Sequence, residues 1–194
     1  EKMCHLDNTV IIALPRGGVP VAYEVAQALG LPLEIFTVKK IGSPNDPEVA
    51  MGAVSEEGDV FFNEHIINIL NLDQYELNHL KIEALSKAKI QGQYLRGNKK
   101  IINLKNKNII LVDDGIATGA TVKVAIKLLR QNRVKQIVLA VPVCSEQSWS
   151  ELNKMVEEFY VLEIPEFFNS VGTHYIEFPQ VSNADVVFSL KRAE

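Results

Sequence analysis

The residues best suited to chemistry are the adjacent carboxylates Asp113 and Asp114, which directly follow an apolar run over residues 109–112. Two carboxylates at the end of a buried strand are costly to bury unless hydroxyl, metal or cationic partners surround them. Small residues and two threonines come next, in the order Gly115-Ile116-Ala117-Thr118-Gly119-Ala120-Thr121. Small side chains let backbone N–H groups approach an anion, and a helix that begins here adds partial positive charge. The segment therefore predicts a phosphate site with a polyol bound beside it.

Other phosphate-binding loops fit this segment less well. It lacks the Gly-Lys-[Ser/Thr] ending of a P-loop, and the chain has no Gly-x-Gly-x-x-Gly dinucleotide fingerprint. An unrelated phosphate-binding hydrolase or kinase-like protein would need a nucleophile elbow or a P-loop, and the sequence has neither. An acidic turn followed by a threonine helix cap is the simple structural alternative, which would suffice for Asp-Asp or Thr-Gly taken separately.

A second glycine-rich turn, Pro15-Arg16-Gly17-Gly18, follows an apolar run over residues 10–14. Glycines expose backbone N–H groups, and a guanidinium can bind two phosphate oxygens at once. Arg16, Gly17 and Gly18 are therefore candidates for binding a second anionic group. Taken alone, the same residues also fit a simple glycine turn with a surface arginine.

Lys39 and Lys40 follow a further apolar run, and the polar segment from them to residue 49 contains one glycine and two prolines. This composition predicts a mobile loop over residues 39–49. The positive charge of the two lysines could stabilise an anion beside that loop. The alternative is a pair of solvated lysines ahead of a surface loop.

Alternating strands and helices must position these groups. Apolar runs bounded by turn residues predict strands, while helical spacing, a capping box at Asp73 and flanking glycines predict helices. The predicted strands cover residues 10–14, 33–38, 108–112, 136–142 and 159–162, with a hairpin over 50–55 and 60–62 and helices over 19–29, 73–97, 121–131, 145–156 and 183–190. This order predicts a doubly wound α/β fold, a mainly parallel sheet flanked by helices with a β-hairpin and flexible-loop insertion. We expect one domain over residues 1–194, with 165–194 as a small C-terminal hood or tail.

Composition narrows the class of protein. With 47% hydrophobic and 23% charged residues, a chain of 194 residues can fill one core. Its net charge of −4 disfavours nucleic acid as a partner, because such binding needs a basic face. No apolar run approaches the about 18 residues of a membrane span, and the N-terminus lacks an apolar signal region. Cys4 and Cys144 fit reduced thiols, so we expect a cytoplasmic protein without membrane contacts.

Residues 112–121 resemble the signature with which type I phosphoribosyltransferases bind 5-phosphoribosyl-1-pyrophosphate (PRPP), a hydrophobic strand followed by Asp-Asp-x-x-x-Thr-Gly-x-Thr. The arginine turn and the lysine pair also stand in the order in which that family places its pyrophosphate loop and basic lid. Further segments, 42–48, 51–54, 167–172 and 175–178, are similar to a bacterial group of predicted phosphoribosyltransferases. The resemblance implies an enzyme that transfers the 5-phosphoribosyl group of PRPP to a nitrogenous base or related nitrogen acceptor, releases pyrophosphate and requires Mg²⁺.

The same resemblance implies roles for individual residues. Asp113 and Asp114 would hold the ribose hydroxyls, directly or through Mg²⁺, and would be catalytic together with Arg16 and Lys40. The 5′-phosphate would bind Ala117, Thr118, Gly119, Ala120 and Thr121, and the pyrophosphate would bind Arg16, Gly17, Gly18, Lys39 and Lys40. Related enzymes often strain a peptide bond in the pyrophosphate loop, so we hypothesise a non-proline cis bond near Arg16-Gly17.

The acceptor is the least defined ligand. Tyr175 and Phe178 in the aromatic tail could stack on a planar base, or could simply cover the C-terminal face. His174 could assist proton transfer, although a single loop histidine is usually a surface residue. Family members that act on 6-oxopurines typically carry an acidic residue where Ala117 stands, so the resemblance disfavours hypoxanthine and guanine and leaves adenine open.

A non-catalytic regulator that senses PRPP or a nucleotide through the same loops is the alternative to an enzyme. Such a regulator would bind PRPP without turnover and would carry a contact surface for a protein or nucleic acid. The acidic charge balance makes the nucleic-acid version less attractive. Because family members are often dimers, a homodimer is an expectation by analogy.

Overall fold

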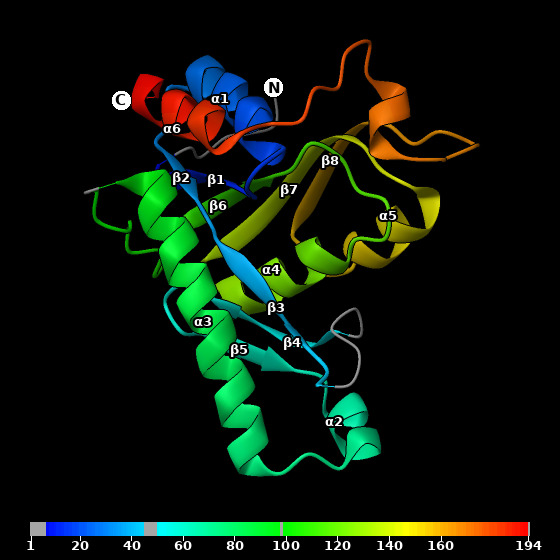
Figure 1. Ribbon diagram of the computed structural model, residues 1–194. Coiled ribbons are helices and arrows are strands. Elements are labelled where there is room, and N and C mark those ends of the chain that lie inside the picture. The colour runs from blue at the N-terminus through cyan, green and yellow to red at the C-terminus, as the bar shows by residue number, and fades with distance from the viewer. Residues whose placement is uncertain (1–6, 45–49, 98, 194) are drawn as a thin grey trace.

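A five-stranded parallel sheet forms the centre of the protein (Figure 1). The structure is a computed structural model that describes residues 7–44, 50–97 and 99–193. The strand order is β2-β1-β6-β7-β8, and each neighbouring pair is parallel. The strands are β1 (Thr9–Ala13), β2 (Leu33–Ile35), β6 (Asn108–Val112), β7 (Gln136–Val143) and β8 (Glu158–Glu163). The predicted doubly wound α/β fold is confirmed.

Helices cover both faces of this sheet, as the alternation of side chains along β1 requires. Val10 and Ile12 belong to one buried cluster, which packs against α4 (Ala120–Gln131) and α5 (Glu146–Leu152). Ile11 and Ala13 belong to the opposite cluster, which includes residues of α1 (Gly18–Leu29) and α6 (Asn183–Arg192). Because both faces are buried, the strands read as continuous apolar runs rather than as alternating ones. This explains why they could be located from sequence.

A second lobe lies to one side of the main sheet and has its own core. Its antiparallel sheet has the order β3-β4-β5, and Ile41, Met51 and Val54 are buried against Ala84 of the long helix. The elements are β3 (Val38–Gly42), β4 (Ala50–Ser55), β5 (Val60–Phe62), α2 (Glu64–Leu70) and α3 (Gln74–Arg96). The hairpin and the capping box at Asp73 are as predicted. α2 was not predicted from the sequence.

The predicted strand over residues 33–38 and the loop that follows it are wrong in their boundaries. β2 ends at Ile35, and the chain crosses through Phe36 and Thr37 into β3, so Lys39 and Lys40 lie in a strand and not in a loop. Their β-ladder with β4 could not be anticipated, because it joins them to residues beyond the polar segment. Residues 45–49 of the predicted loop, and Cys4, lie outside the described residues.

The C-terminal segment returns across the end of the sheet before it forms α6. It contains a short 3₁₀ helix, η1 (Val171–His174), and otherwise has no regular structure until α6. Cys144 is a buried free thiol, and burial raises its pKa to about 11. Within the described ranges, no helix combines the length and apolar character that crossing a membrane requires.

Candidate active site

Two loops meet at the carboxyl end of the sheet, one after β1 and one after β6. A Cβ atom built on Gly17 would lie 1.8 Å from Oδ2 of Asp114, and one on Gly18 would lie 2.9 Å from the backbone of Asp113. Real Cβ atoms do not approach other atoms so closely, so only glycine allows this contact. The backbone reinforces it, since the Leu14 N–H donates to the carbonyl of Val112 at 3.1 Å. The arginine turn and the aspartate pair therefore form one site, as parallel topology predicts.

The carboxylate pair is held in an environment that disfavours its charge. Burial, followed by the neighbouring charge of Asp114, raises the pKa of Asp113 to about 8. Burial also raises the pKa of Asp114 above its ordinary value. The Asp114 N–H donates to Oδ1 of Asp113 at 3.0 Å, and this hydrogen bond lowers the pKa of Asp113 but does not outweigh burial. Without a ligand, the pair therefore retains a proton near neutral pH, and a bound cation or hydroxyl donor would favour its ionised form.

The segment from Ala117 to Thr121 forms the turn into α4. Gly119 has φ 68°, a left-handed conformation that favours glycine, and no side chain caps the helix that begins at Ala120. Its N-cap, Gly119, has no side chain, and the Ala120 N–H donates only a long hydrogen bond, 3.5 Å, to Oγ1 of Thr118. Thr118, Ala120 and Thr121 are exposed. This turn has the geometry that binds a phosphate at a helix N-terminus.

Two hydroxyls behind this turn hold its shape. Ser145 and Ser148 both donate from Oγ to the carbonyl oxygen of Ala117, at 2.6 and 2.7 Å. That carbonyl is thus hydrogen-bonded to α5 and its N-cap, which leaves backbone N–H groups rather than a carbonyl for an anion. Sequence reasoning placed Ser145 only at a helix start and did not identify this role. No signal in the sequence relates residue 117 to residues 145 and 148.

The arginine turn leads into α1, whose first turn also lacks a side-chain cap. The structure contains a non-proline cis peptide bond, located between Pro15 and Arg16. The hypothesis of such a bond is confirmed for this loop, one peptide earlier than Arg16-Gly17. Arg16 and Gly17 line a cavity of about 400 Å³ that also contacts Asp114.

Aromatic residues of the C-terminal segment form the other wall of this cavity. Tyr175 and Phe178 both line it, and their ring centroids lie 4.9 Å apart. The Tyr175 hydroxyl donates a hydrogen bond to the backbone oxygen of Asp114. A Cβ on Gly115 would lie 2.6 Å from Val171, so the segment packs directly on the residue after the aspartates. The structure thus brings the predicted acceptor residues next to the predicted PRPP residues.

His174 contacts other parts of the C-terminal segment and the end of β8. Its ring stacks on Phe168 with centroids 5.5 Å apart, and its Nδ1 lies 3.8 Å from Oε1 of Glu163. Its Nε2 is buried and has no hydrogen-bond partner among the described residues. His174 is not among the residues that line the cavity beside Asp114.

Lys39 and Lys40 lie apart from this cluster, in the second lobe. They pair with Val54 and Ala53 in the ladder between β3 and β4. Lys40 lines a cavity of about 440 Å³ and Lys39 one of about 460 Å³, and residues of α3 line both. Neither lysine is among the residues that line the cavity beside Asp114. Their role as pyrophosphate ligands stays a prediction.

The carboxylate pair is suited to magnesium only if a ligand completes the coordination. In the described part of the chain, no group of three or more His, Cys, Asp or Glu side chains could hold a metal ion. Mg²⁺ commonly binds through one or two carboxylates together with substrate phosphates and water. Asp113 and Asp114 match that donor set.

Comparison with known proteins agrees with this geometry. Residues 3–175 match the family model described as the phosphoribosyl transferase domain. Sequences from two Mycobacterium tuberculosis strains, H37Rv and CDC 1551, are provisionally named phosphoribosyl transferases and are 36% identical over 195 residues. They match all of this chain, which spans only 44% of their length. The crystal structure of TT1426 from Thermus thermophilus is 33% identical, with a TM-score of 0.84 over 96% of this chain and 88% of that one. The chain therefore belongs to the phosphoribosyl transferase domain family.

Proposed function

We propose that this protein is an enzyme that transfers the 5-phosphoribosyl group of PRPP to a nitrogen acceptor, with Mg²⁺ as cofactor and pyrophosphate as the second product. The observation that carries the proposal is the close approach of Gly17 and Gly18 to Asp114 and Asp113. It places the starts of α1 and α4, whose N-cap residues Gly17 and Gly119 have no side chain, at the carboxyl edge of the sheet that also carries the carboxylate pair. PRPP has the matching pattern of two phosphate groups separated by a ribose.

The binding roles follow from this match. The 5′-phosphate would accept hydrogen bonds from the N–H groups of residues 118–121 and from the hydroxyls of Thr118 and Thr121. The ribose hydroxyls would donate to the carboxylates of Asp113 and Asp114. The pyrophosphate would lie at the start of α1, near the guanidinium of Arg16.

Magnesium fits the same carboxylates. Asp113 and Asp114 would hold it together with oxygens of PRPP and water, and it would neutralise charge on the pyrophosphate. Because Asp113 retains a proton near neutral pH in the free protein, binding should release that proton. We therefore expect proton release when PRPP and Mg²⁺ bind as proposed.

The reaction requires one bond to break and one to form at C1 of the ribose. The C1–oxygen bond breaks with its electron pair leaving on pyrophosphate, and a lone pair of the acceptor nitrogen forms the new C1–nitrogen bond. The proton that the acceptor nitrogen loses would pass to water or to the leaving group. Arg16, Lys39 and Lys40 would stabilise the leaving pyrophosphate if the second lobe closes over it.

The acceptor would occupy the cavity between Arg16 and the C-terminal aromatics. Its volume of about 400 Å³ suits a small ring, and Tyr175 and Phe178 offer apolar faces for stacking. Ala117 stands where family members that act on 6-oxopurines typically carry an acidic residue. Its methyl side chain therefore disfavours a 6-oxopurine as the acceptor. We propose a planar nitrogen base as the acceptor class.

The test is pyrophosphate release from PRPP and Mg²⁺ across a panel of purine, pyrimidine and other nitrogen acceptors. The Asp113→Asn/Asp114→Asn variant should abolish release, because it removes both carboxylates. Asp73→Asn is the matched control, since asparagine is an equally good N-cap for α3 and Asp73 is exposed and remote from the loops.

Each outcome separates two functions. Release that depends on one acceptor and is lost only in the double variant supports the transferase. Magnesium-dependent PRPP binding without release from any acceptor would support a PRPP-sensing regulator instead. A folded full-length protein that neither binds PRPP nor releases pyrophosphate would contradict both.

A further inference from the structure

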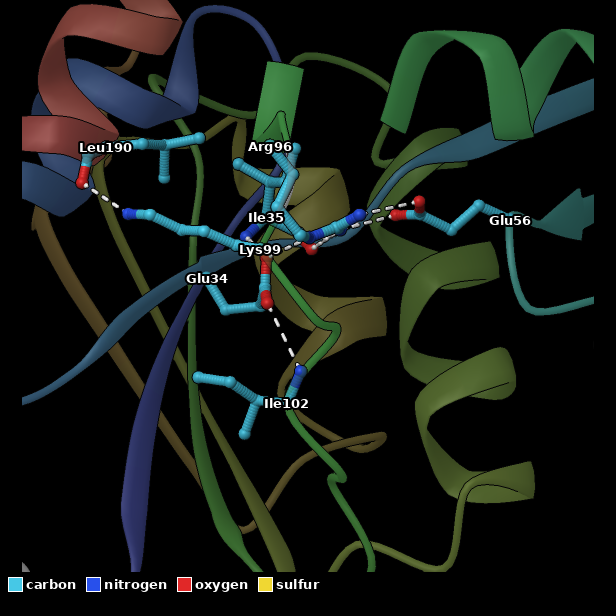
Figure 2. A network of polar contacts seen from close by, with 7 residues as sticks. All are labelled: Glu34, Ile35, Glu56, Arg96, Lys99, Ile102 and Leu190. Atoms are coloured by element: carbon cyan, nitrogen blue, oxygen red, sulfur yellow. Dashed lines mark hydrogen bonds and ion pairs between the residues drawn. The ribbon is translucent and has the colours of Figure 1, made fainter. Parts of the chain in front are cut away.

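Two carboxylates and one arginine join the two lobes where the chain crosses between them. Glu34 lies in β2 of the main sheet, Glu56 lies in the turn after β4 of the second lobe, and Arg96 ends α3. Figure 2 shows the guanidinium of Arg96 between the two carboxylates. Beside this point the chain passes from β2 to β3 through residues 36 and 37. The three side chains therefore link the sheet, the lobe and the long helix at their common junction.

The guanidinium of Arg96 forms hydrogen bonds with one glutamate on each of two sides. Nη1 and Nη2 of Arg96 donate to the two carboxylate oxygens of Glu56, at 2.8 and 2.6 Å, as a bidentate pair. Nε donates to Oε1 of Glu34 at 2.9 Å, and Nη2 also reaches the carbonyl of Ile35 at 3.4 Å. Lysine could not reproduce this fork, because its ammonium is a single point of charge.

Glu34 is fixed in turn by the backbone around it. The Ile35 N–H donates to Oε1 of Glu34 at 2.8 Å, and the Ile102 N–H donates to Oε2 at 3.3 Å (Figure 2). Glu56 is fixed by its own N–H, which donates to the carbonyl of Thr37 at 3.2 Å. Each of the two glutamates is thus tied to nearby backbone as well as to Arg96.

The three charged side chains of the junction are largely buried, and Glu34 and Arg96 also line a cavity of about 770 Å³. The side chains of Arg96, Glu34 and Glu56 are 5%, 7% and 6% exposed. A Cβ on Gly92 would lie 1.8 Å from Oε2 of Glu56, so a glycine inside α3 makes room for that carboxylate. Burial opposes the charge of Arg96, but its hydrogen bonds and proximity to Glu56 and Glu34 outweigh burial and raise its pKa. Removing one partner would leave a buried charge uncompensated, which makes the arrangement cooperative.

A second connection holds the other side of the lobe. Nδ2 of Asn132 donates to Asp59 at 2.6 Å, and Nε2 of Gln131 donates to the carbonyl of Val60 at 3.1 Å. Gln131 ends α4, the same helix whose first turn forms the proposed phosphate site. The lobe is therefore joined to the main sheet through Arg96 and to the C-terminal end of α4 through Gln131 and Asn132.

We propose that Arg96, held by Glu34 and Glu56, is a positioning residue that sets where the lobe places Lys39 and Lys40 relative to the PRPP loops. This inference rests on the proposed function, since it assigns the lobe to the pyrophosphate end of PRPP. β3 begins at Val38, shortly after β2 ends at Ile35, so a rotation at the junction moves both lysines. Arg96 lies in neither phosphate loop and acts through the position of the lobe.

Two ligands distinguish positioning from general stability. Ribose 5-phosphate would use only the phosphate loop and the carboxylates of the main sheet, whereas PRPP also needs the lobe. Arg96→Lys should weaken Mg²⁺-dependent PRPP binding by about tenfold or more, because small misplacements of charged groups are costly. It should change ribose 5-phosphate binding by less than about twofold, because Arg96 belongs neither to the phosphate loop nor to the carboxylate pair.

The matched control is Arg130→Lys. Arg130 also pairs with a glutamate, since its Nη2 donates to both carboxylate oxygens of Glu157, but this pair joins α4 to the residue before β8 rather than to the second lobe. It should leave the ratio of the two affinities unchanged. If Arg96→Lys does not fold, Glu56→Gln retains the shape of the junction and should alter the same ratio in the same direction.

Hydrogen exchange tests the junction without any ligand. Arg96→Lys should accelerate exchange of amides in residues 38–42 and 50–55 while amides in β6 and β7 stay as in wild type, and Arg130→Lys should not do so. Equal acceleration in both sheets, or equal loss of affinity for both ligands, would reduce Arg96 to a general stabilising role and overturn the inference. If exchange accelerates only in residues 38–42 and 50–55 but the wild-type protein does not bind PRPP, the role of Arg96 in positioning the lobe is supported and the proposed function is contradicted.

Discussion

The carboxyl edge of the main sheet and the second lobe are attached to the rest of the molecule in different ways. At the sheet edge, Gly17 and Gly18 touch the aspartate pair without any intervening side chain. The second lobe is instead connected through side chains: Arg96 and Asn132 hydrogen-bond across the boundary. Apolar residues of the lobe, Val38, Phe61 and Leu95, also pack into the cores beside the main sheet. Close backbone approach fixes the first region, while side-chain hydrogen bonds and apolar packing fix the second. We therefore expect the geometry of the ligand-binding edge to depend on its glycines, and the position of the lobe to depend on these side chains.

The two regions also treat their acidic residues differently. Glu34 and Glu56 have a cationic partner within the chain, whereas no salt bridge joins Asp113 or Asp114 to a cation in the ranges the structure describes. Burial raises the pKa values of both aspartates. A paired acid contributes to holding a structure together, while an unpaired and buried acid is a candidate for binding and catalysis. Substitutions in each region test this difference.

The largest effect is expected from Gly17→Ala. The new Cβ would lie 1.8 Å from Oδ2 of Asp114, so that carboxylate must move from its place in the site. We expect kcat/KM for PRPP to fall by about 100-fold, the scale of loss when a reacting group is misplaced by an ångström. Binding of ribose 5-phosphate should fall as well, because Asp114 would hold the ribose. Steady-state kinetics and calorimetric titration measure these two quantities.

Gly52→Ala is the counterpart in the second lobe. Its Cβ would lie 2.3 Å from the carbonyl oxygen of Phe61, so it perturbs the pairing of β4 with β5 and does not touch the PRPP loops. It should weaken PRPP binding and spare ribose 5-phosphate. Equal effects of Gly52→Ala on both ligands would show that the lobe and the sheet edge are one rigid unit, contrary to the comparison. Gly30→Asn, at a left-handed position in open space, controls for replacing a glycine.

Prediction from sequence succeeded where a signal is local. The strands over residues 10–14 and 108–112 were found within a residue of β1 and β6, because parallel strands covered on both faces leave unbroken apolar runs. The contact between Gly17 and Asp114 follows in outline from parallel topology, since both residues come directly after neighbouring strands. The proximity of the two loops was therefore predictable from the sequence.

Prediction failed where partners are remote or the composition is misleading. Lys39 and Lys40 stand in a polar segment, but β4 turns that segment into a strand. The hydroxyls on the Ala117 carbonyl, and the two carboxylates on Arg96, come from residues 28 to 62 positions away. Hydrogen bonds over such separations leave no periodicity in the sequence. The lobe junction was consequently invisible before the structure.

A pH dependence should distinguish the unpaired acids from the paired ones. The pKa of Asp113 is raised from 3.8 to about 8, so between these values the folded protein keeps a proton that the unfolded chain has released. Raising the pH across this window therefore removes stability. Ligands that need the ionised carboxylate show the opposite trend, and PRPP affinity should rise by up to about tenfold per pH unit towards pH 8. Urea unfolding and calorimetric titration at several pH values measure both trends.

Asp113→Asn tests the assignment of this pH dependence. It should make the protein more stable than wild type at pH 8, by on the order of 1–3 kcal/mol, and flatten the stability profile between pH 4 and 8. Asp73→Asn, at an exposed helix cap, should leave the wild-type profile in place. An Asp113→Asn profile that still parallels wild type would mean that another group titrates.

The smallest effect is expected from Tyr175→Phe, which removes the hydroxyl that donates to the backbone oxygen of Asp114. Burial and the nearby aspartates raise the pKa of Tyr175 to about 12, so it is a neutral donor at working pH. Loss of one such hydrogen bond is worth about 0.5–1.5 kcal/mol, and we expect a rise of about threefold in the acceptor KM with the PRPP KM unchanged. Tyr160→Phe, which removes a hydroxyl bonded to Glu158 on the opposite edge strand, is the control and should change neither constant. A matching rise in the PRPP KM would place Tyr175 with the preformed sheet edge rather than with the acceptor.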